Sequence, residues 1–397
     1  MEIKIKTVFS DFSTVEKRKA LLNRINVQLK KQAVILKESD SNDFQALLIL
    51  TGGTEKQAVD LINKHPNIPA KTLLLTHNGY NSLPAALEIS AFLHNEGFSA
   101  EIINLESPAA GNKLKAALSP AKPLCDVRIG VIGKPSDWLI ASSQSADIVK
   151  NTWGIELISV SISSLIENIE VCAQDVPWAM ADLHKIHKVE PRMKDIKNSE
   201  DVYDALRDII AQNDFQGITV RCFDLVNDLK MTACYALAQL NAENFPAGCE
   251  GDIASIVGML WAKKQTGLIP WMANPARIDQ QNSTLVLAHC TAPFNYLKNI
   301  VYRSHFESGL GVGIQGYLDF KKVTIFRLGG KNLDKIWISE GKLLRHLNES
   351  DLCRTQIEIQ LPASDLDKLL HEPLGNHLLV LPGIFSQKLT APFLSSS

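Results

Sequence analysis

The apolar and polar positions in the first third of the chain alternate between the patterns of strands and helices. Short apolar runs predict strands over residues 46–50, 71–75 and 99–104. The segments between them, residues 55–62 and 83–95, have the apolar spacing of helices. Strand, short loop, helix and strand in this order are typical of a parallel sheet with helices on its faces.

A second segment repeats this rhythm after a polar stretch. Residues 108–123 are rich in Gly, Pro, Ala and Lys and are predicted to be a linker, with a domain boundary near Leu124. Beyond the boundary the patterns predict further strands over 127–132, 156–160 and 218–223, and helices over 201–212 and 229–240.

From about residue 269 the pattern changes to closely spaced, short β runs with few helices. These runs cover residues 284–289, 312–318, 322–328, 335–339, 356–360 and 378–381. Such spacing is typical of an antiparallel barrel or sandwich. The chain is therefore predicted to be an α/β protein. Two Rossmann-like α/β domains, residues 1–124 and 125–268, precede a β-rich, barrel-like C-terminal domain, residues 269–397.

Charge and composition narrow the classes of partner. The net charge of −2 over 397 residues gives no electrostatic reason to expect nucleic acid or an anionic membrane as a partner. No apolar run approaches the roughly 18 residues that span a bilayer, and the N-terminus lacks the apolar core of a signal peptide. The seven cysteines are scattered without a CxxC pair, which favours reduced thiols in a cytoplasmic protein.

Two carboxylates stand just before a strongly amphipathic segment. The apolar residues of this segment follow helical spacing: Ile253, Ile256, Val257, Leu260 and Trp261. Asp252 is predicted to cap the helix, because its carboxylate can accept from the free N–H groups of the first turn, and Gly267 is predicted to end it. Glu250 is not needed as a cap, so it is free to bind a metal or move a proton.

Polar loops at the ends of predicted strands are candidate ligand sites. The loop Thr51-Gly52-Gly53-Thr54 could cradle a phosphate, although it matches neither GxGxxG nor a P-loop and could be a plain turn into a helix. Residues 76–82 are a candidate for contacts with sugar hydroxyls, since open α/β sheets bind ligands at this edge. Trp138 occupies a similar place in the second domain and could stack on a sugar ring or simply pack.

Further polar residues border predicted strands. Arg221 is a candidate anion or hydroxyl clamp, with an ion pair to Asp224 as the alternative. His289 ends an apolar strand, where a histidine can bind a ligand or be held by structural hydrogen bonds. Asn376 and His377 follow a glycine and enter a strand, which can present the imidazole to a cleft.

The order of these motifs resembles the L-fucose isomerase family, whose fold L-arabinose isomerases share. The resemblance covers most of the chain from about residue 127. It rests on the motifs Gly133 to Trp138, Cys249 to Asp252, Thr266-Gly267, Trp271 to Asn274, His289-Cys290 and Gly375 to His377. It implies two Rossmann-like domains, a C-terminal barrel-like domain, a homo-oligomer, and a divalent metal, Mn²⁺ or Mg²⁺. The implied reaction interconverts an aldose and a ketose.

The resemblance also implies roles for individual residues. Glu250 matches the family's glutamate, which binds the metal and exchanges protons, and His377 matches its histidine ligand. Asn274 stands where the family has an aspartate that is both ligand and base. Asparagine can coordinate through its carbonyl oxygen, but it carries no charge and cannot act as a base. Asp252 or Asp279 could replace the missing carboxylate, or the reaction could be lost.

The sequence therefore predicts a metal-dependent aldose–ketose isomerase that acts through a cis-enediol on a small-molecule sugar. A sugar-binding relative without isomerase activity is the alternative. Glu250 and Asn274 are the candidate catalytic residues, and Glu250, Asn274 and His377 the candidate metal ligands. The candidates for substrate binding are Asp252, Trp138, Arg221, His289 and Asn376.

Overall fold

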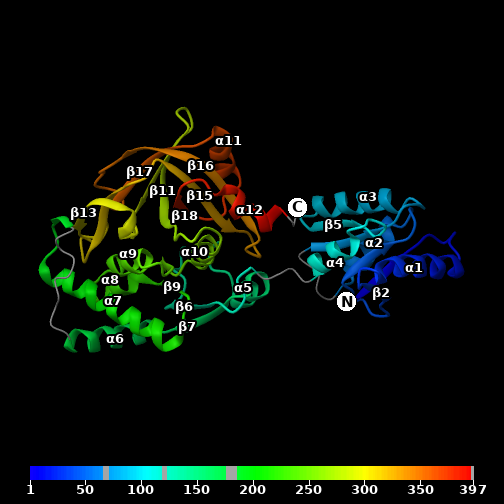
Figure 1. Ribbon diagram of the computed structural model, residues 1–397, viewed down its shortest axis with the longest axis horizontal. Coiled ribbons are helices and arrows are strands. Elements are labelled where there is room, and N and C mark those ends of the chain that lie inside the picture. The colour runs from blue at the N-terminus through cyan, green and yellow to red at the C-terminus, as the bar shows by residue number, and fades with distance from the viewer. Residues whose placement is uncertain (66–70, 119–122, 176–185, 395–397) are drawn as a thin grey trace. The chain divides into compact units, whose positions relative to one another are not determined.

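The computed structural model describes residues 1–65, 71–118, 123–175 and 186–394, which form two compact units (Figure 1). One unit lies within Met1–Ala121 and the other within Lys122–Ser395. The predicted fold class is confirmed, because parallel sheets are followed by a closed antiparallel barrel. Among the helices in the described ranges, none has the length and apolar character needed to cross a membrane.

The first unit is a five-stranded parallel sheet in the order β2-β1-β3-β4-β5. Its strands are β1 (Glu2–Val8), β2 (Ile35–Glu38), β3 (Ala46–Ile49), β4 (Lys71–Thr76) and β5 (Ser99–Asn104). The residues of β3 are all buried, as expected for a strand with both faces covered. Helices α1 (Val15–Lys30) and α4 (Ala110–Leu118) contribute to the core on one face, and α2 (Glu55–Asn63) and α3 (Ser82–Asn95) to the core on the other.

The predicted linker over residues 108–123 is wrong in part, because α4 occupies most of its described residues. Ala110 and Leu114 lie one helical turn apart and are both fully buried against the sheet. These two residues, with the partly buried Ala117 and Leu118, form an apolar face that packs on the sheet and orders the segment as a helix.

The second unit contains a parallel sheet in the order β10-β9-β6-β7. Its strands are β6 (Arg128–Ile132), β7 (Glu156–Val160), β9 (Gly217–Val220) and β10 (Ala247–Cys249). Its helices are α5 (Ala146–Trp153), α6 (Ile162–Asp175), α7 (Met193–Asn213), α8 (Cys222–Leu229), α9 (Cys234–Ala242) and α10 (Ile253–Thr266).

Two predicted boundaries in this segment are wrong. The strand predicted over 218–223 ends at Val220, because Cys222 already begins α8. The helix predicted from residue 229 begins at Cys234, because Lys230 adopts a left-handed backbone (φ 59°) that ends α8. A short apolar run carries no signal for such a change from strand to helix.

A closed barrel of six antiparallel strands completes the second unit, in the order β11-β12-β17-β16-β15-β18. Its strands are β11 (Trp271–Asp279), β12 (Thr284–His289), β15 (Lys322–Gly329), β16 (Lys335–His346), β17 (Thr355–Gln360) and β18 (Leu378–Pro382). Helices α11 (Ala363–His371) and α12 (Ser386–Leu394) also belong to this segment. A small sheet, β14-β13-β8, joins Gly313–Leu318, Leu297–Arg303 and Ile186–Val189, and Phe294–Tyr296 is a 3₁₀ turn.

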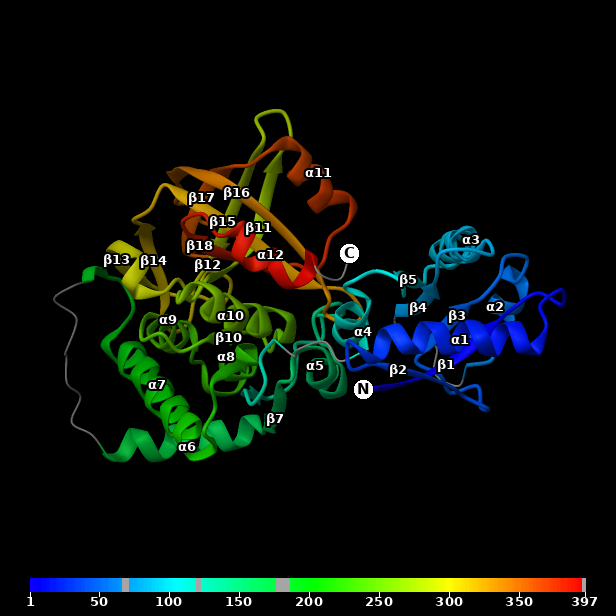
Figure 2. The ribbon, with the colours of Figure 1, turned by 45° about the vertical axis from the view of Figure 1, so that its right-hand side comes forward.

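Helix α10 lies between the parallel sheet and the barrel, as both ribbon views show (Figure 2). Its buried residues share one core with outward-facing barrel residues such as Phe326 and Leu379. The packing is close: a Cβ added at Gly258 would lie 2.5 Å from a methyl group of Leu379. The barrel and the second parallel sheet therefore form one compact unit.

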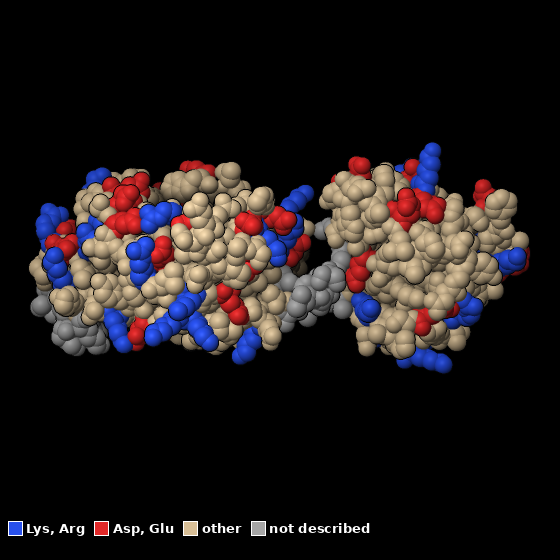
Figure 3. Space-filling view, turned by 90° about the horizontal axis from the view of Figure 1, so that it is seen from above, with Lys and Arg blue, Asp and Glu red and all other residues tan. Residues whose placement is uncertain are grey.

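Charged side chains of both signs are interspersed on the surface. On the face drawn in Figure 3, Lys and Arg lie among Asp and Glu, and neither sign forms a large continuous patch. This distribution agrees with the small net charge of −2.

Candidate functional site

A tight turn between β10 and α10 carries Glu250. Glu250 and Gly251 both have left-handed backbones, with φ of 61° and 72°, and this conformation is strained for a glutamate. The turn packs directly on the loop after β6: the Ser136 N–H donates to the Glu250 carbonyl at 2.9 Å. A Cβ at Gly251 would lie only 2.7 Å from Cα of Pro135. The backbone at Glu250 is therefore fixed by its surroundings.

The structure brings Glu250, His289 and His377 together. One oxygen or nitrogen of each residue lies within 4.8 Å of the corresponding atoms of the other two. The residues come from the β10–α10 turn, the end of β12 and the segment just before β18. Both histidines are buried and Glu250 is largely so, and the three side chains are therefore shielded from most of the solvent.

His377 is held by one nitrogen and open at the other. Its Nδ1 lies 2.8 Å from Oδ2 of Asp252, so Nδ1–H donates to this carboxylate. Its Nε2 is buried, has no hydrogen-bond partner, and lies 3.6 Å from Oε1 of Glu250. Burial alone lowers the pKa of His377, but the hydrogen bond to Asp252 and the negative charges of Asp252 and Glu250 outweigh it and raise that pKa.

Asp252 is confirmed as the N-cap of α10, accepting from the Ser255 N–H at 2.7 Å. It also receives two nitrogens of Arg327, at 3.1 and 3.3 Å. Burial raises the pKa of Asp252, but Arg327 and His377 more than reverse this and hold that pKa well below its usual range. With both oxygens engaged and no solvent exposure, Asp252 lies behind His377 rather than at an open surface.

Sequence reasoning missed Arg327. It is only 1 % exposed, lies in β15, and donates to the hydroxyls of Ser142 at 2.6 Å and Ser255 at 2.5 Å as well as to Asp252. The available signal was an arginine within an otherwise apolar strand, Val-Thr-Ile-Phe-Arg-Leu. Such a charge needs a buried partner of opposite sign.

Trp138 reaches Glu250 directly. Its indole Nε1–H donates to Oε2 of Glu250 at 2.6 Å, while half of the Trp138 side chain stays exposed. Burial raises the pKa of Glu250, but the interaction with nearby His377 and the hydrogen bond from Trp138 outweigh it and lower that pKa. Glu250 is therefore an ionised carboxylate at neutral pH.

His289 is the third member of the cluster, although the sequence indicated a role in substrate binding. Its Nδ1 lies 2.8 Å from the hydroxyl of Thr291. Burial lowers the pKa of His289 to about 4, and nearby His377 adds to this shift. The ring is therefore neutral at pH 7, which is the form that binds metals.

Asn274 lies between the two strands that carry the histidines. Its strand, β11, pairs with β12 through Asn274 and Ala288, next to His289. On the other side Ala273 pairs with Leu378, next to His377. Asn274 is half-buried, and its side-chain amide makes no hydrogen bond to the residues that the structure describes.

Asp279 does not reach the cluster. It is the last residue of β11, five residues or about 17 Å along the strand from Asn274. Its carboxylate accepts from the backbone and the side chain of Asn282 in the following turn. Replacement of the missing aspartate by Asp279 is therefore ruled out.

Arg221 makes the ion pair that was the alternative to a clamp. It donates to Asp224 at 3.0 Å, to Asp137 at 2.8 Å and to the Pro135 carbonyl at 2.8 Å. These contacts tie α8 to the loop that carries Trp138. Asn376 is exposed in the loop just before His377.

The cysteines are all free thiols. Cys249 precedes Glu250 and its sulfur lies 3.1 Å from that of Cys222. Cys290 follows His289 and is buried.

Comparison with known proteins gives distant relatives of one kind. No protein-family model matches the chain. The chain is 22% identical over 317 residues to a sulfoquinovose isomerase of Alkalicoccus urumqiensis, covering 73% of this chain and 69% of that protein. It is 21% identical over 348 residues to a sulfoquinovose isomerase of Priestia megaterium, covering 82% of this chain and 75% of that protein. A sulfoquinovose isomerase of a Clostridium species is 23% identical over 235 residues, covering 54% of this chain and 50% of that protein.

These relatives carry the name of a sugar isomerase, the class of reaction that the motif order implied. Because the first two similarities span more than two thirds of both chains, they are not confined to one domain.

Proposed function

We propose that the chain is a metal-dependent aldose–ketose isomerase of the L-fucose isomerase type. The observation that carries the proposal is the convergence of Glu250, His289 and His377 around the unpartnered Nε2 of His377. The names of the relatives support the same class of reaction. A homo-oligomer is part of the proposal through the resemblance to that family.

The three side chains fit a divalent metal. A carboxylate and two imidazoles are the donors that Mn²⁺ and similar ions accept. A buried nitrogen without a partner, such as Nε2 of His377, calls for an occupant. Asp252 fixes the ring through Nδ1, an arrangement that orients histidine ligands in metalloproteins. We propose that Asn274, on the strand between those of the two histidines, adds its carbonyl oxygen as a weaker ligand.

The bound metal would polarise O1 and O2 of an open-chain sugar and stabilise the charge of the cis-enediol. Glu250, ionised in the folded protein, takes the proton from C2 and returns it to C1, while the hydroxyl proton of O2 is transferred to O1, and the two transfers together convert aldose to ketose. Trp138 donates to Oε2 of Glu250 and fixes the carboxylate, whose Oε1 faces the unpartnered Nε2 of His377. Asn274 cannot serve as a second base, so one carboxylate makes both transfers.

We propose sulfoquinovose as the first substrate to test, on the strength of the relatives' names. The purified chain, loaded with Mn²⁺, is incubated in D₂O with sulfoquinovose and with neutral aldoses. Deuterium entry at carbon is followed by ¹H NMR, together with ketose formation. Because one carboxylate makes both transfers, a sugar labelled with deuterium at C2 and incubated in H₂O instead should carry part of its label to C1 of the ketose.

The Glu250→Gln variant should lose about 10²–10⁴-fold in rate, the usual contribution of a general base. Glu167→Gln, at an exposed position of α6, is the matched control and should leave the rate unchanged. Absence of isomerisation and exchange on every sugar of the panel, with metal present, would refute the proposal.

A sugar-binding relative without isomerase activity is the second candidate, and Asn274 is the observation that favours it. A site with one carboxylate binds a divalent cation less tightly than a site with two. This candidate predicts that a sugar raises the melting temperature while Mn²⁺ does not. Copurification of one metal per chain would contradict it.

A further inference from the structure

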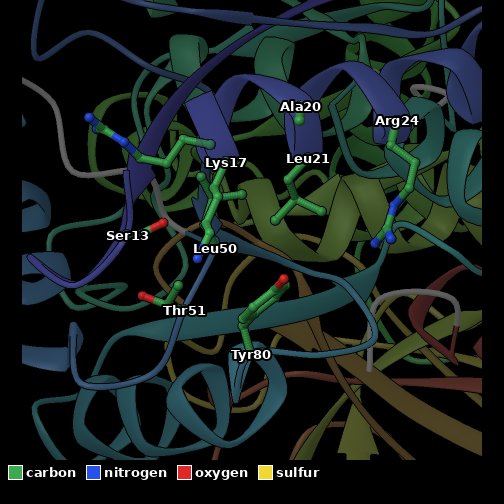
Figure 4. Close-up of a pocket in the computed structure, with 9 residues that line it drawn as sticks. Ser13, Lys17, Ala20, Leu21, Arg24, Leu50, Thr51 and Tyr80 are labelled. Carbon is green, nitrogen blue, oxygen red and sulfur yellow. The ribbon is translucent and has the colours of Figure 1, made fainter. Parts of the chain in front are cut away.

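The first unit contains a cavity of its own at the carboxyl ends of its strands (Figure 4). Its volume is about 240 Å³. It is lined by residues from the β1–α1 loop, from α1, from the end of β3 and from the β4–α3 loop: Ser13, Lys17, Arg18, Ala20, Leu21, Arg24, Leu50, Thr51 and Tyr80. None of these residues belongs to the cluster around Glu250.

The topology of the sheet singles out this place. In the order β2-β1-β3-β4-β5, the chain runs outward from β1 in one direction and from β3 in the other. The helices after β1 and β3 therefore cover opposite faces and leave a crevice between the two strand ends. Ligands of doubly wound sheets bind in this crevice. Ser13 follows β1 and Thr51 follows β3, so the cavity lies at this point.

Helix α1 directs positive charge at the cavity. Lys17 and Arg18 make no ion pair with the residues that the structure describes, whereas Arg24 binds Glu106 at 2.9 Å. The Nε of Arg18 is buried without a hydrogen-bond partner, and its guanidinium lies 3.5 Å from the ring centre of Phe9. The aromatic face orients the arginine, while the buried N–H remains to be satisfied.

The loops of the cavity are held in place without using these charges. The Ser10 N–H donates to the Thr51 hydroxyl oxygen at 2.7 Å, which joins the loops after β1 and β3. The Gly52 N–H donates to the Tyr80 carbonyl at 2.8 Å, which joins the loops after β3 and β4. Tyr80 itself has a left-handed backbone, with φ of 52°. Residues with a strained backbone conformation like that of Tyr80 are common in loops that bind ligands.

The close-up shows polar and apolar groups around one space. Lys17, Leu21 and Arg24 extend from α1 on one side, and Thr51 and Tyr80 lie on the other. The hydroxyls of Ser13 and Thr51 offer donors beside the lysine, whereas Leu21 and Leu50 offer apolar surface. This combination suits a ligand with a charged oxyanion at one end and a small carbon body at the other.

We propose that this crevice binds a small organic molecule with a tetrahedral oxyanion, a phosphomonoester or a sulfonate. Lys17 and Arg18 hold the oxyanion with the hydroxyls of Ser13 and Thr51, and Leu21, Leu50 and Tyr80 contact the carbon body. The site accounts for the two polar loops, 51–54 and 76–82, that the cluster around Glu250 does not use. It supplies the chain with a ligand site separate from the metal-type cluster.

Isothermal titration calorimetry on the full chain tests the site. The probes are glucose 6-phosphate, methanesulfonate, inorganic phosphate and glucose. We expect glucose 6-phosphate to bind and glucose not to bind. The affinities for methanesulfonate and inorganic phosphate are then compared, and the anion that binds more tightly shows whether the site prefers a sulfonate or a phosphate. Failure of all three anions to bind would overturn the proposal.

Matched variants locate the binding. Lys17→Gln should weaken glucose 6-phosphate binding by about tenfold, the usual effect of losing a charged hydrogen-bond partner. Lys19→Gln removes the same charge from an exposed position of α1 outside the cavity and should have no effect. Equal binding by Lys17→Gln and the unchanged protein would overturn the assignment.

The site can fail or succeed independently of the proposed isomerase. Glu250→Gln should bind glucose 6-phosphate as tightly as the unchanged protein while losing isomerisation. Binding that is lost in Glu250→Gln and kept in Lys17→Gln would place the anion at the cluster in the second unit and refute the site in the first.

Discussion

His377 donates from Nδ1 to Oδ2 of Asp252 across 2.8 Å, and this bond turns the unpartnered Nε2 toward Glu250. The hydrogen bond at Nδ1 fixes the orientation of the ring, and Nε2 remains free to bind a ligand. Asp252 is itself a helix cap, so the position of the imidazole is set by the start of α10. The geometry of the cluster thus follows from an ordinary rule of helix formation.

Asp252→Asn should weaken Mn²⁺ binding by about 10–100-fold, because the amide orients the imidazole less well and adds no charge. Calorimetric titration of the metal-free protein measures the affinity. Asp279→Asn changes a carboxylate on β11 that lies outside the cluster and serves as control. Equal loss of affinity in both variants would contradict the positioning role of Asp252.

Arg327→Met should lower the free energy of unfolding by about 3–5 kcal/mol, because it leaves Asp252 buried with one charged partner fewer. Urea denaturation measures the change. Arg345→Met removes an exposed partner of Glu358 and should cost no more than about 1 kcal/mol. A similar cost for both arginines would show that the buried pair is not a stabilising element.

The depressed pKa of His289 makes stability depend on pH. Below about pH 6.5 the unfolded chain protonates this histidine, whereas the folded protein does so only near its pKa of about 4. Protons therefore favour unfolding between these values. The free energy of unfolding should fall by up to about 1.4 kcal/mol per pH unit as pH drops through this window.

Urea denaturation of the metal-free protein at several pH values measures this slope. His289→Gln should reduce the slope by up to about 1.4 kcal/mol per pH unit, and His371→Gln, at an exposed position of α11, should leave it unchanged. An unchanged slope in His289→Gln would contradict the assignment.

Trp138→Phe should move the acid limb of the pH–rate profile to higher pH. The substitution keeps an aromatic ring but removes the N–H that lowers the pKa of Glu250. Since Glu250 acts as a base only when ionised, a higher pKa means that more alkaline pH is needed for full rate. Measurement of kcat/KM from pH 4 to 8 tests this, and an acid limb at the original pH would count against the hydrogen bond.

Gly251→Ala should destabilise the protein and misplace Glu250. The alanine would have to adopt a left-handed backbone conformation, and its Cβ would lie 2.7 Å from Cα of Pro135. Gly267→Ala is the matched control, because Gly267 has a similar φ of 76° but no atom within 4 Å of the added Cβ. The control should lose about 1 kcal/mol of stability and keep its activity. If both variants lose activity to the same extent, the conclusion that the turn at Gly251 positions Glu250 is contradicted.

The sequence predicts the start of α10 well because every signal for it is local. Asp252 and Gly267 mark the two ends by their side-chain and backbone preferences, and apolar spacing fills the interval. Once Asp252 is assigned to the cap, Glu250 stands out as the carboxylate without a structural task. The antiparallel strands from Thr284 onward are similarly local signals.

The rest of the cluster depends on contacts distant in sequence. Arg327 lies 75 residues from Asp252, and no local pattern links them. His289 could be assigned to a sugar or to a metal, and only its approach to His377 groups it with possible ligands. The strand β11 was not predicted, because Asn274 and Pro275 interrupt its apolar pattern.

The ion pair of Arg327 and Asp252 also governs how the second unit could be divided. The arginine comes from the barrel and the aspartate from the first turn of α10, so cutting the chain near residue 269 would separate two opposite charges that are almost fully buried. A barrel expressed alone would present an unmatched cation, and the remaining α/β layer an unmatched anion. Residue 268 lies within one compact unit, and we expect a protein cut there to lose stability in both parts.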